Sequence, residues 1–119
     1  LAAIARALDT PIMAAERVFT PSDALRVASL RAADLISVKI MKCGGLLRGR
    51  QIAGIAEAAG IACYGGDMFE TGIAHLAGAH LIAATPNISL RCEFYQPAPG
   101  LGIAVGGDRL RKYAVEVLR

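Results

Sequence analysis

Acidic and basic side chains recur at the ends of four short apolar runs in this sequence. They are Glu16 after the first run, Lys39 and Lys42 at the end of the second, Asp67 and Glu70 after the third, and Glu93 at the end of the fourth. Lysine and carboxylate groups act as general acids and bases when they lie within hydrogen-bonding reach of a substrate. A lysine that points into the fold is costly unless it meets carboxylates or a substrate anion, so these residue types suggest paired charges or an anionic substrate at the strand ends.

Each of these side chains also has a purely structural interpretation. Lys39 can form an ion pair with a neighbouring strand, Glu70 can favour the positive end of a helix, and Glu16 can be a loop carboxylate. His75 and His80 are five residues apart and do not share a helical face as the i, i+4 histidines of a zinc helix do. We therefore predict that they are core or surface histidines rather than metal ligands.

The apolar runs alternate with segments of helical periodicity. Strands are predicted over 11–14, 35–40, 61–64 and 88–94, and helices over 1–8, 21–32, a segment containing 52–59, 72–84 and a last segment from 108. Thr20-Pro21-Ser22-Asp23 is a strong start signal for the helix over 21–32. Gly60 is predicted to cap the C-terminal end of the helix that contains 52–59. In the fourth helix we expect Ile73, Leu76, Ala77, His80 and Leu81 to face inward.

A repeated strand–helix unit predicts an α/β fold with a parallel sheet, in which functional side chains collect at the carboxyl ends of the strands. Strand alternation places Ser37 and Lys39 on the face opposite Ile36 and Val38. Four strands are half of the eight that a (β/α) barrel needs. We expect a missing half, supplied by an absent N-terminal segment or by a second copy of the chain. An open flavodoxin-like sheet is the structural alternative.

Composition is that of a folded domain. The 119 residues are 55% hydrophobic and 19% charged, and the net charge of +3 comes from scattered basic residues without interleaved aromatics, which argues against a nucleic-acid partner. No apolar run is long enough to suggest a membrane span. Cys43, Cys63 and Cys92 are not spaced as disulfide or zinc-site cysteines. We expect a cytoplasmic protein in which Cys63 and Cys92 are buried thiols.

Three motifs in order resemble the fifth to seventh barrel strands of the muconate lactonizing and mandelate racemase branch of the enolase superfamily. They are Pro11-Ile-Met-Ala-Ala-Glu16, Ser37-Val-Lys39-Ile-Met-Lys42-Cys-Gly-Gly45 and Tyr64-Gly-Gly-Asp-Met-Phe-Glu70-Thr-Gly-Ile73, and the tail Pro99-Gly-Leu-Gly102 also resembles that family. The form of the motifs is nearest the muconate cycloisomerases. The resemblance implies that residues 1–119 are the C-terminal part of an enolase-type barrel, with the capping domain and first barrel strands absent.

The same resemblance implies a function and a set of site residues. Family members bind Mg²⁺ or Mn²⁺ through three carboxylates, and the metal stabilises an enediolate-like intermediate formed by proton transfer next to a carboxylate. In the cycloisomerases the reaction interconverts cis,cis-muconate and a muconolactone, a step of aromatic catabolism. Lys39 matches a sixth-strand lysine that is an acid/base or an electrostatic support, Glu70 matches a seventh-strand glutamate that binds the substrate carboxylate or the intermediate, and Asp67 and Met68 match pocket positions.

The sequence departs from the family pattern at a metal-ligand position. The family's fifth-strand motif usually reads Ala-Asp-Glu-Ser, with the Asp on the metal, and Ala15 occupies that position here. Racemase-like members use a glutamate one position later, so the resemblance implies Glu16 as the candidate substitute ligand. We therefore hold two hypotheses for the isolated chain: a cycloisomerase or racemase/dehydratase-type half that works only with the missing strands, and a non-catalytic, truncated or decayed half that self-associates.

Overall fold

A parallel sheet whose strand order follows the chain, β1–β2–β3, forms the base of the fold. The computed structural model describes residues 1–93. Its elements are α1 (Ala2–Ala7), β1 (Met13–Ala14), α2 (Pro21–Ser29), β2 (Leu35–Val38), α3 (Ile40–Cys43), α4 (Leu46–Ala58), β3 (Ala62–Gly65) and α5 (Gly72–Ala83). Met13 pairs with Leu35 and Ile36 with Cys63, so the carboxyl ends of the three strands lie at one edge.

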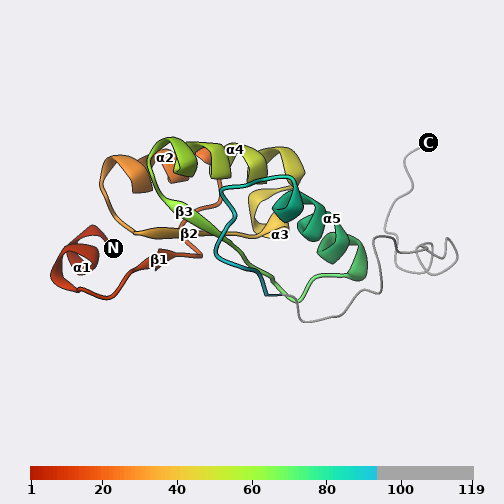
Figure 1. Ribbon diagram of the computed structural model, residues 1–119, viewed down its shortest axis with the longest axis horizontal. Coiled ribbons are helices and arrows are strands. Elements are labelled where there is room, and N and C mark those ends of the chain that lie inside the picture. The colour runs from red at the N-terminus through yellow and green to blue at the C-terminus, as the bar shows by residue number, and fades with distance from the viewer. Residues whose placement is uncertain (94–119) are drawn as a thin grey trace, which may run out of the picture.

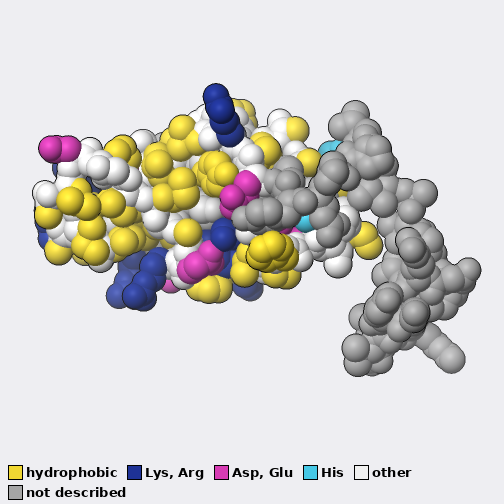
Figure 2. Space-filling view, turned by 90° about the horizontal axis from the view of Figure 1, so that it is seen from below, with side chains coloured by type: hydrophobic (Ala, Val, Ile, Leu, Met, Phe, Trp, Pro, Cys, Tyr) yellow, Lys and Arg dark blue, Asp and Glu magenta, His cyan; other side chains and the backbone are white. Residues whose placement is uncertain are grey.

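Helices α2, α4 and α5 lie on one side of this sheet (Figure 1). Sequential strand order with the helices on one side is the arrangement of a curling (β/α) barrel, whereas an open doubly wound sheet has helices on both faces. The flavodoxin-like alternative is therefore wrong. The sheet face turned away from the helices carries hydrophobic side chains, with acidic and basic side chains gathered near its middle (Figure 2).

The apolar core lies between the sheet and helices α2 and α4. Its fully buried members include Ala24, Ile36, Ile52, Ala56 and Cys63. Helix α2 begins as its sequence predicts: the Asp23 amide donates to Thr20 Oγ1 at 3.2 Å, and the Thr20 amide donates to Asp23 Oδ2 at 2.9 Å. Gly60 takes a φ of 72° just after α4, which is the left-handed conformation that a glycine cap allows.

The second strand is shorter than predicted. β2 ends at Val38, and Lys39 is the N-cap of the short helix α3 instead of the penultimate strand residue. The Cys43 amide donates to the Lys39 carbonyl at 2.9 Å, and Gly44 ends the helix at a φ of 79°. A short apolar run such as Ile40–Met41 fits a strand or a helix equally well by periodicity, and the Gly44 cap decides for the helix.

The predicted fourth strand over 88–94 is also wrong within the described residues, where it contributes a single parallel bridge between Gly65 and Cys92. Cys63 bonds the Asn87 carbonyl and the Leu90 amide, and Gly65 bonds the Arg91 carbonyl and the Glu93 amide. The five residues from Asn87 to Arg91 therefore face the three residues from Cys63 to Gly65, and the surplus bulges out of the ladder. Arg91 takes a φ of 81° at this bulge, Cys92 is exposed rather than buried, and Phe94 lies outside the described residues.

The inward face of α5 differs from the predicted one. Its buried residues are His75, Gly78 and Leu81, while Ile73 and His80 are exposed. Helix α5 carries apolar side chains on all of its faces, so the periodicity of its sequence does not show which face is buried. The buried face is set by the close approach of α5 to α4, where a Cβ on Gly49 would lie 2.7 Å from Leu81 Cδ2. The predicted helix from Asp108 and the Pro99–Gly102 tail lie outside the described residues, and no helix within 1–93 is long and apolar enough to cross a membrane.

Candidate active site

Residues from three separate loops meet at the carboxyl edge of the sheet. Glu16 follows β1, Lys39 follows β2, and Asp67 to Glu70 follow β3. Parallel register brings these loops to the same edge, which is where parallel α/β proteins place their chemistry. The side chains group into two sets: Glu16 with Lys39 and Lys42, and Asp67 with His75. Glu70 lies beside the second loop.

Lys39 and Glu16 form an ion pair between the ends of β2 and β1. Lys39 Nζ donates to Glu16 Oε1 at 2.6 Å, and the lysine side chain is 14% exposed while the glutamate is 56% exposed. The hydrogen bond from Lys39 holds the pKa of Glu16 below its usual range against the opposing effect of desolvation, and the charges of Lys42 and Lys39 lower the pKa further. Glu16 is therefore an anion at neutral pH.

Gly66 gives the Lys39 side chain the space it needs. A Cβ at position 66 would lie 2.4 Å from Ser37 Oγ, 2.8 Å from Lys39 Cγ and 2.9 Å from Lys39 Cε. Ser37 and Lys39 therefore lie on the same face of the sheet, as strand alternation predicted, and the aliphatic stem of the lysine crosses directly over the backbone of β3. The second glycine of the Tyr-Gly-Gly motif is thus a packing requirement for Lys39.

Lys42 is a site residue for which the sequence pattern predicted no separate role. Its side chain is buried, and Nζ donates to the Ala15 carbonyl and, at 3.0 Å, to the Ser37 carbonyl. Among residues 1–93, no carboxylate forms an ion pair with it. Burial lowers its pKa. Lys42 therefore joins the ends of β1 and β2, and the Lys-x-x-Lys spacing is the signal that could have identified it, because one turn of α3 carries the second lysine back toward β1.

Glu70 lies in the loop between β3 and α5 and is 5% exposed. Its Oε1 accepts a hydrogen bond of 3.2 Å from the Met41 amide, at the first turn of α3. Phe69 before it takes a φ of 56°, an uncommon conformation for a bulky residue that often accompanies functional sites. The loop thus presents a buried carboxylate beside the segment that carries Lys39.

Asp67 and His75 form a buried pair next to this loop. His75 Nε2 lies 2.6 Å from Asp67 Oδ2, and the side chains are 3% and 0% exposed. Asp67 Oδ1 also accepts from the Met68 amide at 2.7 Å, and His75 Nδ1 lies 3.2 Å from the Thr71 carbonyl. His75 is a core histidine, which is one of the two environments that the sequence pattern allows, and the pattern does not identify its partner because the separation of eight residues crosses a loop. Met68 is half-buried.

The described residues do not fit a divalent cation. Within 1–93 no three His, Cys, Asp or Glu side chains converge where they could hold a metal ion. Ala15 offers only its carbonyl, which Lys42 engages, and Oε1 of Glu16 is bound by Lys39. A hard cation needs several oxygen ligands at about 2.0–2.6 Å, and this set supplies too few.

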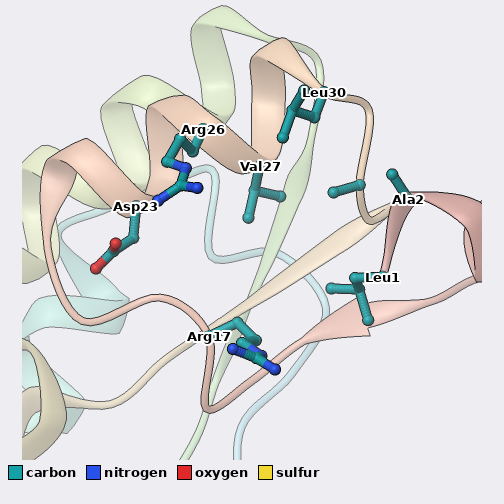
Figure 3. Close-up of a pocket in the computed structure, with 8 residues that line it drawn as sticks. Leu1, Ala2, Arg17, Asp23, Arg26, Val27 and Leu30 are labelled. Atoms are coloured by element: carbon teal, nitrogen blue, oxygen red, sulfur yellow. The ribbon is translucent and has the colours of Figure 1, made fainter.

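A separate pocket of about 360 Å³ lies between α1, α2 and the end of β1 (Figure 3). Arg17, Asp23 and Arg26 line it beside apolar residues such as Val27 and Leu30. The carboxylate of Asp23 is engaged in the cap of α2. None of the residues predicted for the site lines this pocket, so we place the candidate active site at the strand ends instead.

Comparison with known proteins shows which enzymes this chain resembles. Muconate cycloisomerase 1 of Rhodococcus opacus is 45% identical over 97 residues, which are 82% of this chain and 26% of that protein. A muconate cycloisomerase structure from Azorhizobium caulinodans superposes with a TM-score of 0.74 at 56% identity, covering 81% of this chain and 27% of that one. A dipeptide epimerase structure from Enterococcus faecalis V583, solved with Mg and the dipeptide L-Leu-L-Tyr, superposes with a TM-score of 0.72 at 42% identity. The match covers 76% of this chain and 25% of that one.

The chain spans about a quarter of the length of these relatives. The family model described as enolase C-terminal domain-like matches residues 1–117, almost the whole sequence. Parallel strands in chain order, helices on one side and the ordered motifs at the strand ends all agree with that match. The chain therefore belongs to the enolase C-terminal domain-like family.

Proposed function

We propose that this chain supplies part of an active site that transfers a proton at a carbon next to a substrate carboxylate. The observation that carries the proposal is the position of Lys39: its ammonium lies at the carboxyl edge of the sheet, hydrogen-bonded to Glu16 across the strand ends. A lysine held there can deliver a proton or stabilise negative charge as it develops on the substrate.

Glu70 is the second proposed catalytic residue. It is a buried carboxylate fixed by the Met41 amide, and in this position it can bind the substrate carboxylate through a shared proton or hold the intermediate. Asp67 and Met68 are proposed to shape the substrate pocket. In Asp67 this role is indirect, because its carboxylate is bound to His75, so we assign it to holding the loop that presents Met68 and Glu70.

The proposed reaction is the interconversion of cis,cis-muconate and a muconolactone, because cycloisomerases are among the relatives with high identity. The proposed substrate is a small carboxylate. We propose that the parent enzyme is an isomerase of aromatic catabolism and that it is located in the cytoplasm. When bound, a Mg²⁺ or Mn²⁺ ion in such an enzyme supplies Lewis-acid stabilisation. Among residues 1–93, the side chains do not form a site for this ion.

A racemase or epimerase is the second candidate function. The similarity to the Enterococcus faecalis dipeptide epimerase favours it. In this candidate function we assign Lys39 the role of the acid/base on one side of the substrate. A non-catalytic half that pairs with a second copy is the third. The edge of β1 has no partner strand among the described residues, and an open edge favours association.

A chimera discriminates among these functions. Residues 1–119 replace the matching segment of Rhodococcus opacus muconate cycloisomerase 1, and turnover of cis,cis-muconate and of L-Ala-L-Glu is measured with and without Ala15→Asp. We expect muconate turnover in the Ala15→Asp chimera, and none from the isolated chain, which lacks enough groups to complete proton transfer. Dipeptide epimerisation without muconate turnover would favour the second candidate, and a folded chimera inactive toward both would favour the third.

A further inference from the structure

Two lysine ammonium groups bind the oxygen atoms at the end of β1. Lys39 Nζ donates to Glu16 Oε1 at 2.6 Å, and Lys42 Nζ donates to the Ala15 carbonyl. The side chain at position 15 is a methyl group and adds no oxygen. Oε1 of Glu16 and the Ala15 carbonyl oxygen thus already accept from a positively charged donor.

The Lys39 side chain is held in place from both ends. Its stem passes over Gly66 so closely that a Cβ there would lie 2.8 Å from Lys39 Cγ, and its ammonium is fixed by Glu16. The side chain is 14% exposed, so solvent and salt weaken this attraction less than they weaken a surface ion pair. A divalent cation arriving at Glu16 meets both a bound donor and a like charge.

We infer that the Lys39 ammonium occupies the cation position at the end of β1, so that a divalent cation can bind at Glu16 only by displacing it. The disagreement with the metal chemistry implied by the family thus has two parts: a missing carboxylate at Ala15 and an internal competitor at Lys39. The inference rests on the proposed function only for the choice of a divalent cation as the competing ligand.

Mn²⁺ binding to the 119-residue chain tests this directly. Free Mn²⁺ is measured by electron paramagnetic resonance, and the site is located by the paramagnetic broadening of backbone amide signals. The variants are Ala15→Asp, Ala15→Asp with Lys39→Met, and Ala15→Asp with Arg17→Met. The last is the matched control, because it removes the same charge from an exposed neighbour of Glu16.

We expect the double variant with Lys39→Met to bind Mn²⁺ about tenfold more tightly than Ala15→Asp alone, because the carboxylate loses a charge-assisted hydrogen bond that competes for it. The Arg17→Met control should shift affinity by less than about threefold, as a screened surface charge does. Broadening should centre on residues 15–17 and disappear with Glu16→Gln.

Equal affinity of Ala15→Asp with and without Lys39→Met would overturn the inference. If the Lys39→Met chain does not fold, the native chain gives the answer: the inference requires no broadening at Glu16 at millimolar Mn²⁺, and broadening that Glu16→Gln removes would contradict it. Neither result depends on catalysis, so an inactive chimera and a failed competition remain distinguishable.

Discussion

His75 Nε2 and Asp67 Oδ2 lie 2.6 Å apart in the interior, across the loop that connects β3 to α5. The pair joins the first turn of α5 to the second residue after β3, and Glu70 lies between them in sequence. Since Glu70 is itself fixed only by the Met41 amide among the hydrogen bonds of the described residues, the Asp67–His75 pair is the principal anchor of this loop.

Removing His75 should therefore destabilise the chain. His75→Ala leaves the buried Asp67 carboxylate without this partner, and breaking a buried pair from one side costs about 3 kcal/mol or more. His80→Ala is the control: the residue is on the same helix but exposed, and its removal should change the free energy of unfolding by less than about 0.5 kcal/mol. Urea unfolding measures both, and similar losses in the two variants would contradict an anchoring role for the pair.

Gly66→Ala should disturb Lys39 through packing alone. The new Cβ would meet Ser37 Oγ and the stem of Lys39, and overpacking of this kind costs about 1–3 kcal/mol. In Gly54→Ala, within α4, the new methyl meets no atom within 4 Å, so it should stabilise the chain by up to about 1 kcal/mol through helix propensity. Thermal unfolding compares the two, and a Gly66→Ala chain as stable as the native one would show that Lys39 has room to move.

Arg91→Gly should stabilise the chain. Arg91 takes a φ of 81°, which a side chain disfavours and glycine accepts, so the substitution should relieve about 1 kcal/mol of strain. Arg91→Ala removes the same charge but keeps a Cβ, and it should not show this gain. Denaturant titration of both variants separates strain from charge, and an equal effect of Gly and Ala would rule out backbone strain as the cause.

Alkaline pH should reveal the buried thiol of Cys63. Burial raises its pKa from 9.0 to about 11, so the folded chain retains the proton between these values while the unfolded chain loses it. Stability due to this group is therefore present below pH 9 and decreases as pH rises toward 11, by about 1–2 kcal/mol. The lowered pKa of buried Lys42 acts with the opposite sign, since the unfolded lysine binds more protons there.

The Cys63 contribution is isolated by comparing variants that keep Lys42. Cys63→Ala should flatten the loss of stability between pH 9 and 11, whereas Cys92→Ala, which removes an exposed thiol, should leave it unchanged. Unfolding free energies measured across that interval provide the test. An unchanged slope in Cys63→Ala would mean that its thiol titrates normally in the folded chain.

Local rules predicted the features of this fold that depend on adjacent residues. The Thr20–Asp23 cap, the Gly60 stop and the common face of Ser37 and Lys39 each follow from spacing within a few positions. The parallel sheet followed from the repeat of strand and helix. The strand pattern predicted which residues reach the strand ends, and the structure brings Lys39 and Glu16 together there.

Features that depend on distant packing were not predictable in this way. The burial of His75 depends on where the loop after β3 returns Asp67, and the inward face of α5 depends on its approach to Gly49. The apolar sequence 88–94 read as a strand because alternation does not show a bulge, and Arg91 gives no sign in sequence of its left-handed backbone. Side-chain pattern fixes which residues prefer burial, whereas loop geometry decides which of them meet.

Solvent deuterium exchange next to the substrate carboxylate tests the proton-transfer role of Lys39 most directly. In the Ala15→Asp chimera, muconolactone incubated in D₂O should incorporate deuterium at that carbon, as followed by proton NMR. Lys39→Ala should slow the incorporation by about 100-fold or more, the usual contribution of a positioned acid or base, while Arg48→Ala on the exposed surface of α4 leaves it unchanged. Exchange in Lys39→Ala at the rate of the parent chimera would contradict the account, because the proton would then move without the residue on which the proposed function rests.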